Sequence, residues 1–359
     1  PGGMASSPRF SMARSLELLQ SELRAHQDRS PDAAKLAAAG AGLPAKAAPQ
    51  LRSVIKGHER KVYCVQWSGD SSRIASAGQE GCVLVSDPLS GMKTSAPIKA
   101  SFAMSTALNL DAKLLAHGGM DNTVTITDIV GASPTTRKQC SGHDGYISAL
   151  RFVPGHDSQL LSASGDGKAK LWDVKTGAAV ATFGGHSSDC LCLSVAADGP
   201  PKIFATGGLD HTVRLWDISS GKSAGTFLAH RGEHADCIDL ALGKVNAICM
   251  FPNGGAIAYA TEQGQFGLFD VGSHACVSRG DTASKGAAMS IAVSRSGRIT
   301  YVGFEKGAIS VCDTFDMSQF DDVSSGHERS VASMSVAPDG TAMATSGFDG
   351  LVKVWVGSA

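Results

Sequence analysis

The sequence has no surplus of charge and no long hydrophobic run. Its 359 residues include 32 Lys and Arg against 33 Asp and Glu, which gives a formal net charge of −1 at pH 7. A chain this close to neutral lacks the basic surface that nucleic acids or anionic membranes attract, so we expect neither as a partner. No apolar stretch is long enough to span a bilayer and no signal peptide is visible. We therefore expect a cytoplasmic protein without direct membrane insertion.

Motifs of metal, cofactor and catalytic chemistry are also missing. The nine cysteines show no metal-ligand spacing, which is typical of reduced thiols in a cytosolic protein. Cys190 and Cys192 stand two residues apart in an expected strand, so both point to one face and into packing. We find no dinucleotide fingerprint and no pair of carboxylates that suggests a catalytic cleft. We predict no cofactor, no metal site and no catalytic residue.

What the sequence does contain is a repeated unit, seen in full from Gly185 to Asp217. The unit begins with Gly185-His186, ends with Leu215-Trp216-Asp217, and has three strand-like runs separated by turns between them. The position of Trp216 recurs at steps of 41 to 53 residues, at Ser86, Thr127, Trp172, Trp216, Phe269, Cys312 and Trp355. Such a period with Gly-His and Trp-Asp marks is typical of WD-repeat β-propellers. We predict an all-β, seven-bladed WD-repeat propeller preceded by an N-terminal α-helix.

The ends of the repeat array predict how the ring closes. The last copy ends with its third strand, at Leu351 to Trp355, and lacks a fourth. A strand-like run from Leu51 to Lys56 precedes the first Gly-His and supplies the missing strand, which removes the open sheet edge. We accordingly divide the chain into a disordered N-terminus at residues 1–10, a helical segment with a linker at residues 11–49, and the propeller at residues 50–359.

The N-terminal segment carries an apolar heptad seam. From Ser11 to Gln27 the pattern is helical, and a second short helix is expected after Ser30, an N-cap residue followed by Pro31. The seam of the first helix consists of Met12, Leu16, Leu19 and Leu23. A helix this short is marginal alone in water, so it needs a surface to pack against. Packing on the propeller and a coiled coil with another chain both remain open.

Three sets of residues combine the side chains of a hydrolase triad, but they occur at matching positions in three repeats. A set found once would suggest an active site, whereas a set found in three blades suggests a structural role. In WD repeats the Gly-His histidine, a strand hydroxyl, a corner Asp and the Trp indole form a buried hydrogen-bond chain. The expected quartets are His143, Ser162, Asp166 and Trp172; His186, Thr206, Asp210 and Trp216; and His327, Thr345, Asp349 and Trp355. Blades without the Trp are expected to have lost this network and to be either softer or held by packing instead.

Five longer runs resemble the β subunit of heterotrimeric G proteins. They are Gly118-Gly119-Met120-Asp121-Asn122, Gly142-His143-Asp144-Gly145-Tyr146, Phe251-Pro252-Asn253-Gly254, Ser294-Arg295-Ser296-Gly297-Arg298 and Leu268-Phe269-Asp270. The resemblance covers nearly the whole chain. It implies a signal transducer whose N-terminal helix forms a coiled coil with a small γ subunit. One propeller face then binds the GDP-loaded α subunit or effectors, and a lipidated partner brings the complex to a membrane.

The resemblance also implies a set of partner-binding residues. The positions that match are Lys61, Tyr63, Lys93, Phe102, Met104, Asn122, Tyr146, Asp189 and Phe348, and two of these, Phe102 and Phe348, stand where the family usually has Trp. A Phe keeps the apolar area of a Trp but loses its indole donor. Taken singly, each of these positions is equally well explained as an exposed loop residue.

Departures from the family pattern support a second interpretation. Glu59 replaces a Leu, Cys82 replaces a Lys, Lys244 replaces an Asp, and residues 231–243 form an insertion expected on the same face. A reversed charge beside an inserted loop opposes docking of the usual α subunit. The alternative function is a non-signalling propeller built permanently into a large ciliary, cytoskeletal or membrane complex.

Overall fold

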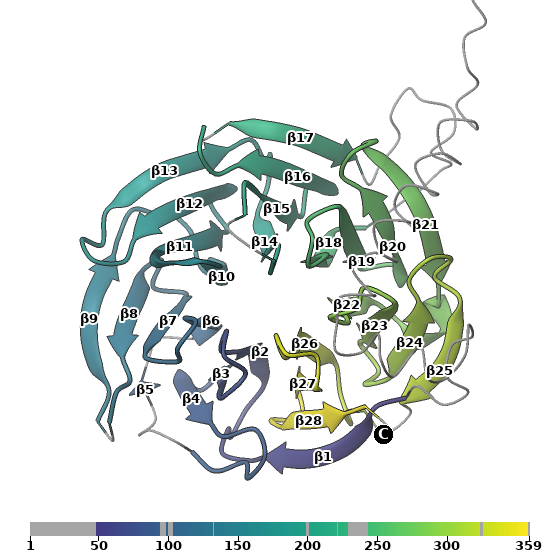
Figure 1. The fold of residues 1–359 in the computed structure, drawn as a ribbon, viewed down its shortest axis with the longest axis horizontal. Helices are drawn as coiled ribbons and strands as arrows, with labels where there is room; N and C mark the ends of the chain where they lie inside the picture. Colours follow the sequence, from purple (N-terminus) through teal and green to yellow (C-terminus); the bar gives the residue numbers. More distant parts are fainter. Residues whose placement is uncertain are drawn as a thin grey trace, which may run out of the picture.

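Seven four-stranded antiparallel sheets surround a central axis and form a closed ring (Figure 1). The computed structural model describes residues 48–93, 98–99, 103–131, 133–198, 201–220, 222–228, 243–323 and 326–357. The predicted seven-bladed all-β propeller is confirmed. The helix expected at residues 11–27, the second short helix and the linker up to residue 47 lie outside the described residues. Within those residues, no helix has the length and hydropathy of a membrane span.

Each blade takes its four strands in sequence order from the axis outward, except the seventh. Blade 1 contains β2 (Val62–Trp67), β3 (Ile74–Gly78), β4 (Cys82–Ser86) and β5 (Ile98–Lys99). Blade 2 contains β6 (Ala103–Leu108), β7 (Leu114–Gly119), β8 (Val124–Asp128) and β9 (Thr135–Cys140). Blade 3 contains β10 (Ile147–Val153), β11 (His156–Ser164), β12 (Lys168–Asp173) and β13 (Ala179–Gly184). Blade 4 contains β14 (Cys190–Val195), β15 (Ile203–Gly208), β16 (Thr212–Asp217) and β17 (Ser223–Leu228).

The remaining three blades complete the ring. Blade 5 contains β18 (Val245–Met250), β19 (Ala256–Thr261), β20 (Gln265–Asp270) and β21 (Ala275–Asp281). A 3-10 turn, η1 (Ala283–Lys285), leads into blade 6, with β22 (Ala288–Val293), β23 (Ile299–Phe304), β24 (Ile309–Asp313) and β25 (Gln319–Val323). Blade 7 contains β26 (Val331–Val336), β27 (Ala342–Gly347) and β28 (Val352–Val356), with β1 (Gln50–Ile55) as its outer strand.

Pairing of β1 with β28 closes the ring as predicted. The two strands are antiparallel, and the register places Leu51 opposite Trp355 and Val54 opposite Lys353. Figure 1 shows the purple β1 on the outside of the yellow β28. Because β1 covers the outer edge of β28, no third-strand edge is left unpaired in this blade.

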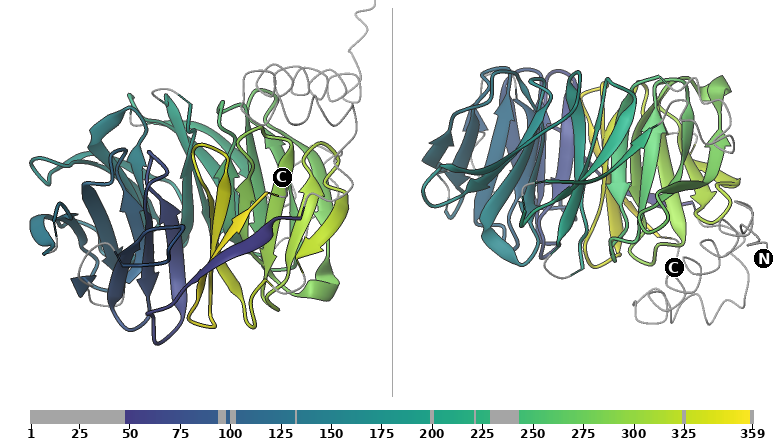
Figure 2. Two further views of the ribbon diagram at one scale, coloured as in Figure 1. Left: turned by 60° about the horizontal axis from the view of Figure 1, so that its bottom comes forward. Right: turned by 90° about the horizontal axis from the view of Figure 1, so that it is seen from above.

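The hydrophobic core is divided among the spaces between neighbouring blades. One cluster joins Leu161 and Leu171 of blade 3 to Leu193, Phe204 and Trp216 of blade 4, all at most 2 % exposed. Both faces of each sheet are covered by the adjacent sheets, so the middle strands contain continuous apolar runs instead of an alternating pattern. Figure 2 shows the strands crossing the disc between its two faces, which places the connecting loops on those faces.

The first strand of every blade carries a register shift close to where it begins. The shifts fall between Val62/Cys64, Ala103/Ser105, Ile147/Ala149, Cys190/Cys192, Val245/Ala247, Ala288/Ser290 and Val331/Ser333. Side chains at these bulges reach the next blade: the Ser148 hydroxyl donates to the Cys190 carbonyl at 2.5 Å, and the Ser290 hydroxyl to the Val331 carbonyl at 2.8 Å. The repeated bulge therefore links neighbouring blades around the axis.

Candidate functional site

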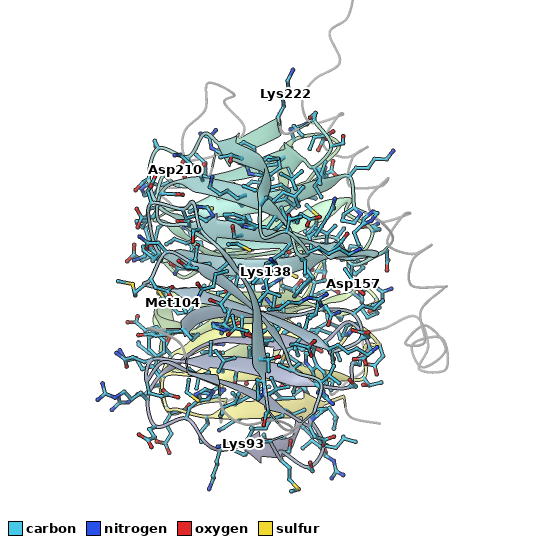
Figure 3. The ribbon with its side chains drawn as sticks, turned by 90° about the vertical axis from the view of Figure 1, so that its left-hand side faces the viewer. Lys93, Met104, Lys138, Asp157, Asp210 and Lys222 are labelled. Atoms are coloured by element: carbon cyan, nitrogen blue, oxygen red, sulfur yellow. The ribbon has the colours of Figure 1, made fainter. Side chains whose placement is uncertain are left out.

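One face of the ring gathers the loops that precede each first strand and the corners between second and third strands. Backbone hydrogen bonds join the two kinds of loop: Gln79 N–H donates to Lys61 O at 2.8 Å, and Gly165 N–H to Tyr146 O at 2.9 Å. Figure 3 shows Asp210 of one such corner and Met104 toward the same side of the ring, with Asp157 toward the other. We call this side the rim face. It carries the described members of the predicted partner-binding set apart from Lys93, whose backbone pairs with Ser86 at the far end of β4.

The polar quartet of blade 3 is a single chain of buried hydrogen bonds. His143 Nδ1 lies 2.7 Å from Asp166 Oδ2, its Nε2 lies 2.8 Å from Ser162 Oγ, and the Trp172 indole N–H donates to the same Oγ at 2.8 Å. A carboxylate only accepts, so we assign the histidine proton to Nδ1. The Ser162 hydroxyl then donates to Nε2 and accepts from Trp172, which leaves no donor unused.

Burial fixes the protonation states in this quartet. The His143 side chain is fully enclosed, and this burial lowers its pKa despite the favourable contact with Asp166. Burial also disfavours ionisation of Asp166, but hydrogen bonds from His143 and from the Asp144 N–H outweigh it and lower the pKa of the carboxyl. The quartet therefore holds a neutral imidazole against a carboxylate at neutral pH.

The other two expected quartets have the same geometry. In blade 4, His186 lies 2.8 Å from Asp210 and 2.7 Å from Thr206, whose hydroxyl accepts from Trp216 at 2.8 Å. In blade 7 the corresponding distances are 2.9 Å for His327 to Asp349, 2.8 Å for His327 to Thr345 and 2.9 Å for Trp355 to Thr345. The hydroxyl residues of all three quartets have no solvent-exposed surface. A hydroxyl that is enclosed and doubly hydrogen-bonded cannot reach a substrate as a nucleophile.

The expectation that every blade without Trp has lost the network is wrong for blade 1. His58 Nδ1 contacts Glu80 Oε1 at 2.5 Å and its Nε2 contacts Ser76 Oγ at 2.8 Å. Glu80 follows Ser76 by four residues, as Asp166 follows Ser162. That offset was visible in the sequence and would have revealed the network. Ser86 occupies the place of the Trp, and its buried hydroxyl has no hydrogen-bond partner in the described ranges.

The other Trp-less blades use different contacts. Blade 5 relies on packing, with Tyr259 and Phe269 stacked at a centroid distance of 4.6 Å. In blade 2, His117 Nε2 lies 3.4 Å from Thr127 Oγ1. In blade 6, the Lys285 ammonium donates to Ser310 Oγ and to both carboxylate oxygens of Asp322, each at 2.7 Å. The prediction of packing in place of the network thus describes blade 5 but not these two.

Lys61, Tyr63 and Phe348 form a half-buried cluster across the junction of blades 7 and 1. The Tyr63 and Phe348 rings meet edge to face at 5.9 Å, and Lys61 Nζ lies 4.7 Å from the centre of the Phe348 ring. Phe348 is held in place by its backbone N–H, which donates to Ser330 O at 3.0 Å. The result is a rigid aromatic and cationic surface on the rim face.

Tyr146 and Asp189 form a second cluster, between blades 3 and 4. The Tyr146 hydroxyl donates to Asp189 Oδ2 at 2.9 Å. Burial and this hydrogen bond raise the pKa of the tyrosine, so it stays protonated as a donor. The ring also covers Gly165, where a Cβ would clash with it. The absence of a side chain at Gly165 therefore fixes the ring position.

The other predicted residues are more dispersed. Met104 is half-buried at the start of β6, and Asn122 occupies the β7–β8 corner with a positive φ of 58°. Lys93 is exposed and pairs with Ser86 in an isolated bridge. Phe102 lies outside the described residues.

The residues that depart from the family pattern differ in their contacts and in their exposure. Lys244 Nζ forms an ion pair with Glu262 at 2.9 Å, and Glu262 N–H donates to Lys244 O at 3.1 Å. Glu59 is exposed, whereas Cys82 is half-buried and burial raises the pKa of its thiol. Residues 229–242, most of the expected insertion, lie outside the described part. Glu262 was missed from the sequence because nothing in the local pattern links it to Lys244.

No group in the described ranges suggests bound metal. The His, Cys, Asp and Glu side chains there form no cluster of three or more that could hold an ion. All eight described cysteines are free thiols. The rim face is an array of hydrogen-bonded, aromatic and charged side chains, and this arrangement suits contacts with other proteins.

Comparison with known proteins identifies the family. A family model described as "G protein beta WD-40 repeat protein" matches residues 12–356. The guanine nucleotide-binding protein subunit beta of Solanum tuberosum is 31% identical over 321 residues, covering 84% of this chain and 82% of that protein. Subunit beta-1 of Nicotiana tabacum is 31% identical over 325 residues, with the same two shares. The corresponding subunit of Oryza sativa subsp. japonica is 31% identical over 323 residues, again with these shares. The resemblance seen in the sequence is confirmed, and the chain belongs to the G protein β WD-40 repeat family.

Proposed function

We propose that this chain is a G-protein β subunit that holds a γ subunit through residues 11–27 and docks a GDP-bound α subunit or effectors on the rim face. The observation that carries the proposal is the pair of clusters described above. Lys61, Tyr63 and Phe348 form one, and Tyr146 with Asp189 forms the other. Both span blade junctions and remain partly open to solvent.

The physical support is preorganisation. Each cluster side chain is already fixed by a ring contact or a hydrogen bond, so binding a partner costs little side-chain entropy. Tyr, Phe and Met are residue types that are enriched at the cores of protein interfaces. The family supplies the partner class, because its relatives are guanine nucleotide-binding protein β subunits.

Nucleotide-dependent capture tests the docking face. The chain, co-expressed with a γ subunit, is immobilised and offered an α subunit loaded with GDP or with a non-hydrolysable GTP analogue. We expect capture with GDP only, and at least tenfold weaker capture by Met104→Ala and by Lys61→Ala. Met92→Ala is the matched control, because Met92 is 70% exposed in the β4–β5 turn, at the strand ends opposite the rim face.

Two results would contradict this proposal. One is equal capture of the α subunit in both nucleotide states. The other is equal weakening of capture by Met104→Ala and Met92→Ala, which would show that α-subunit binding does not depend on the rim face.

The γ-binding part rests on the heptad seam of residues 12–23. Replacing Leu19 and Leu23 with Asp removes its apolar contacts, so we expect loss of the γ chain on size-exclusion chromatography. The propeller should keep its own unfolding transition, because its described core clusters pack strands of neighbouring blades against one another. A variant that still co-elutes with γ would exclude the coiled coil.

The second candidate, a permanent structural subunit, is favoured by one feature of the rim face. Lys244 and Glu262 neutralise each other where the resemblance implies an Asp in place of Lys244. Affinity purification from native cells followed by mass spectrometry separates the two functions. Recovery with a small lipidated helical chain supports signalling, whereas recovery only within a large particle that lacks such a chain supports the structural role.

A further inference from the structure

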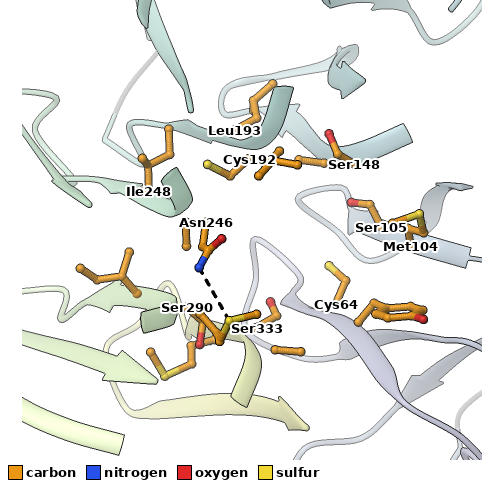
Figure 4. Close-up of a pocket in the computed structure, with 18 of the residues that line it drawn as sticks. Cys64, Met104, Ser105, Ser148, Cys192, Leu193, Asn246, Ile248, Ser290 and Ser333 are labelled. Atoms are coloured by element: carbon orange, nitrogen blue, oxygen red, sulfur yellow. Dashed lines mark hydrogen bonds between the residues drawn. The ribbon is translucent and has the colours of Figure 1, made fainter. Parts of the chain in front are cut away.

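The central tunnel contains a single charged side chain. Residues from the first strands of all seven blades line a cavity of about 130 Å³ on the axis. Figure 4 shows Cys64, Ser105, Ser148, Cys192 and Ser333 around its opening. Arg151 of β10 is the one Lys, Arg, Asp or Glu in this lining, as far as the chain is described. Arg151 is half-buried in this tunnel, and no carboxylate lies on the described wall beside it.

Arg151 is poorly satisfied by the protein. One nitrogen, Nη1, donates to the carbonyl of the adjacent Leu150 at 2.9 Å. Gln66 Nε2, from blade 1, donates to the same carbonyl at 3.0 Å. A guanidinium has five N–H donors, and no ion pair reaches this one from any described residue. Most of its hydrogen-bonding capacity is thus directed to the cavity.

The neighbouring thiols do not neutralise this charge. Burial lowers the pKa of Arg151, and the groups that act against this effect are Cys64, Cys249 and Cys192. Burial raises the pKa of Cys192 to about 12 and also raises that of Cys249, so both are neutral thiols at pH 7. A half-buried cation that loses part of its hydration without gaining a counter-charge carries an energetic cost. An anion from solvent would remove that cost.

Two hydroxyls in the same lining are available as further donors. Ser148 and Ser290 each donate to the carbonyl of the next blade. Ser105 of β6 and Ser333 of β26 also line the cavity, but neither side-chain hydroxyl has a hydrogen-bond partner among the described residues. Ser105 is only 1% exposed, so its hydroxyl is enclosed with the cavity.

We propose that the tunnel binds a small oxyanion of the size of inorganic phosphate, held by the Arg151 guanidinium and by the Ser105 and Ser333 hydroxyls. The planar fork of a guanidinium matches two oxygens of such an ion, which a spherical halide does not offer. The inference does not rest on the function proposed for the rim face, although Tyr63 and Met104 of that face also line the cavity.

Calorimetric titration of the full chain, purified with its natural partner, tests the site. Inorganic phosphate is titrated in a buffer whose ionic strength is held constant with chloride. We expect one phosphate per chain and at least tenfold weaker binding to Arg151→Gln, which keeps a polar side chain without the charge. Arg137→Gln is the matched control, because Arg137 is an exposed arginine of β9. No phosphate binding by the unmodified chain, or equal binding by Arg151→Gln, would overturn the proposal.

A second variant keeps the test decisive if Arg151→Gln does not fold. The double change of Ser105 and Ser333 to Ala removes two hydroxyls without changing charge, so we expect about tenfold weaker phosphate binding. Unchanged binding by this variant would overturn the assignment of the site. Titration with glycerol phosphate identifies the source of the ion, since tighter binding of the ester than of phosphate indicates a phosphorylated metabolite.

Discussion

At the scale of the residue, one hydroxyl in each blade with a complete quartet forms hydrogen bonds with two buried partners. Ser162 donates to His143 and accepts from Trp172, and Thr206 and Thr345 do the same in blades 4 and 7. An unmade hydrogen bond costs most where water is excluded. The quartets therefore lock the Gly-His loop and the corner of the rim face onto the blade interior.

Replacing Ser162 with Ala should destabilise the protein by about 3 kcal/mol, because it leaves the Trp172 indole and the His143 Nε2 without partners. Urea unfolding followed by tryptophan fluorescence measures the change. Ser141→Ala, at an exposed position two residues before His143, is the control and should stay within about 0.5 kcal/mol of the unmodified chain. Equal stability of the two variants would contradict a structural role for the quartet.

His117 predicts a loss of stability in mild acid. Burial lowers its pKa from 6.5 to about 4, so the folded protein keeps it neutral while the unfolded chain protonates it. The unfolded state binds more protons in this window, so stability falls as pH decreases from 6.5 to 4. The loss from this residue should approach about 3 kcal/mol. Unfolding of the unmodified chain and of His117→Gln at pH 7.5, 5.5 and 4.5 measures the difference, and parallel pH profiles for the two proteins would contradict the prediction.

The sequence predicts the residues of the quartets because spacing repeats along the chain. It does not predict which partner-binding residues touch one another. Tyr146 and Asp189 were both expected on the surface, but their hydrogen bond joins two blades, and the register between blades is not encoded in a local pattern. The ion pair of Lys244 and Glu262 lies within blade 5, and it was missed because no local pattern links the residue before β18 to the residue after β19.

At the scale of the element, the first strand of each blade has the largest number of structural roles. It lines the tunnel, carries the bulge and bonds to the next blade. The outer strand is the simplest element, since it pairs on one side only. The seventh outer strand, β1, differs because it joins residues 50–55 to residues 352–356.

Removal of β28 tests how far the ring depends on this junction. A chain that ends at Gly350 loses the strand between β27 and β1, including Trp355 of the third quartet. We expect a broad, non-cooperative urea transition by circular dichroism and rapid cleavage within residues 50–60 by trypsin. A chain that lacks only residues 358–359 keeps β28 and is the control. A sharp transition at the original midpoint in the shorter chain would show that six blades are sufficient.

At the scale of the whole molecule, the disc presents two faces with different chemistry. The rim face carries the aromatic and charged clusters, while the opposite face carries turn residues such as Met92. Fold class, blade number and ring closure were all predicted from the repeat, because the period and its marks persist through seven copies. The binding partner was not predicted from the repeat, because side chains on one face determine which protein binds, and not the blades that support them.

Charge on the rim face should control α-subunit affinity under the proposed function. Lys244→Asp restores the acidic side chain that the resemblance implies and frees Glu262 from its ion pair. We expect binding of the GDP-bound α subunit to become at least fivefold tighter by biolayer interferometry, with a larger gain at low salt. Lys175→Asp, at an exposed site after β12, is the control for net charge. Equal changes in both variants would show that the effect is non-specific.

The junction between β1 and β28 has a consequence for biosynthesis. Val356 pairs with Gln50, so its partner strand is made hundreds of residues earlier. During translation, six blades can assemble in the order in which they leave the ribosome, whereas the seventh sheet has to wait with an uncovered edge. Such a nascent chain is expected to need a chaperone that shields β1 until β28 emerges.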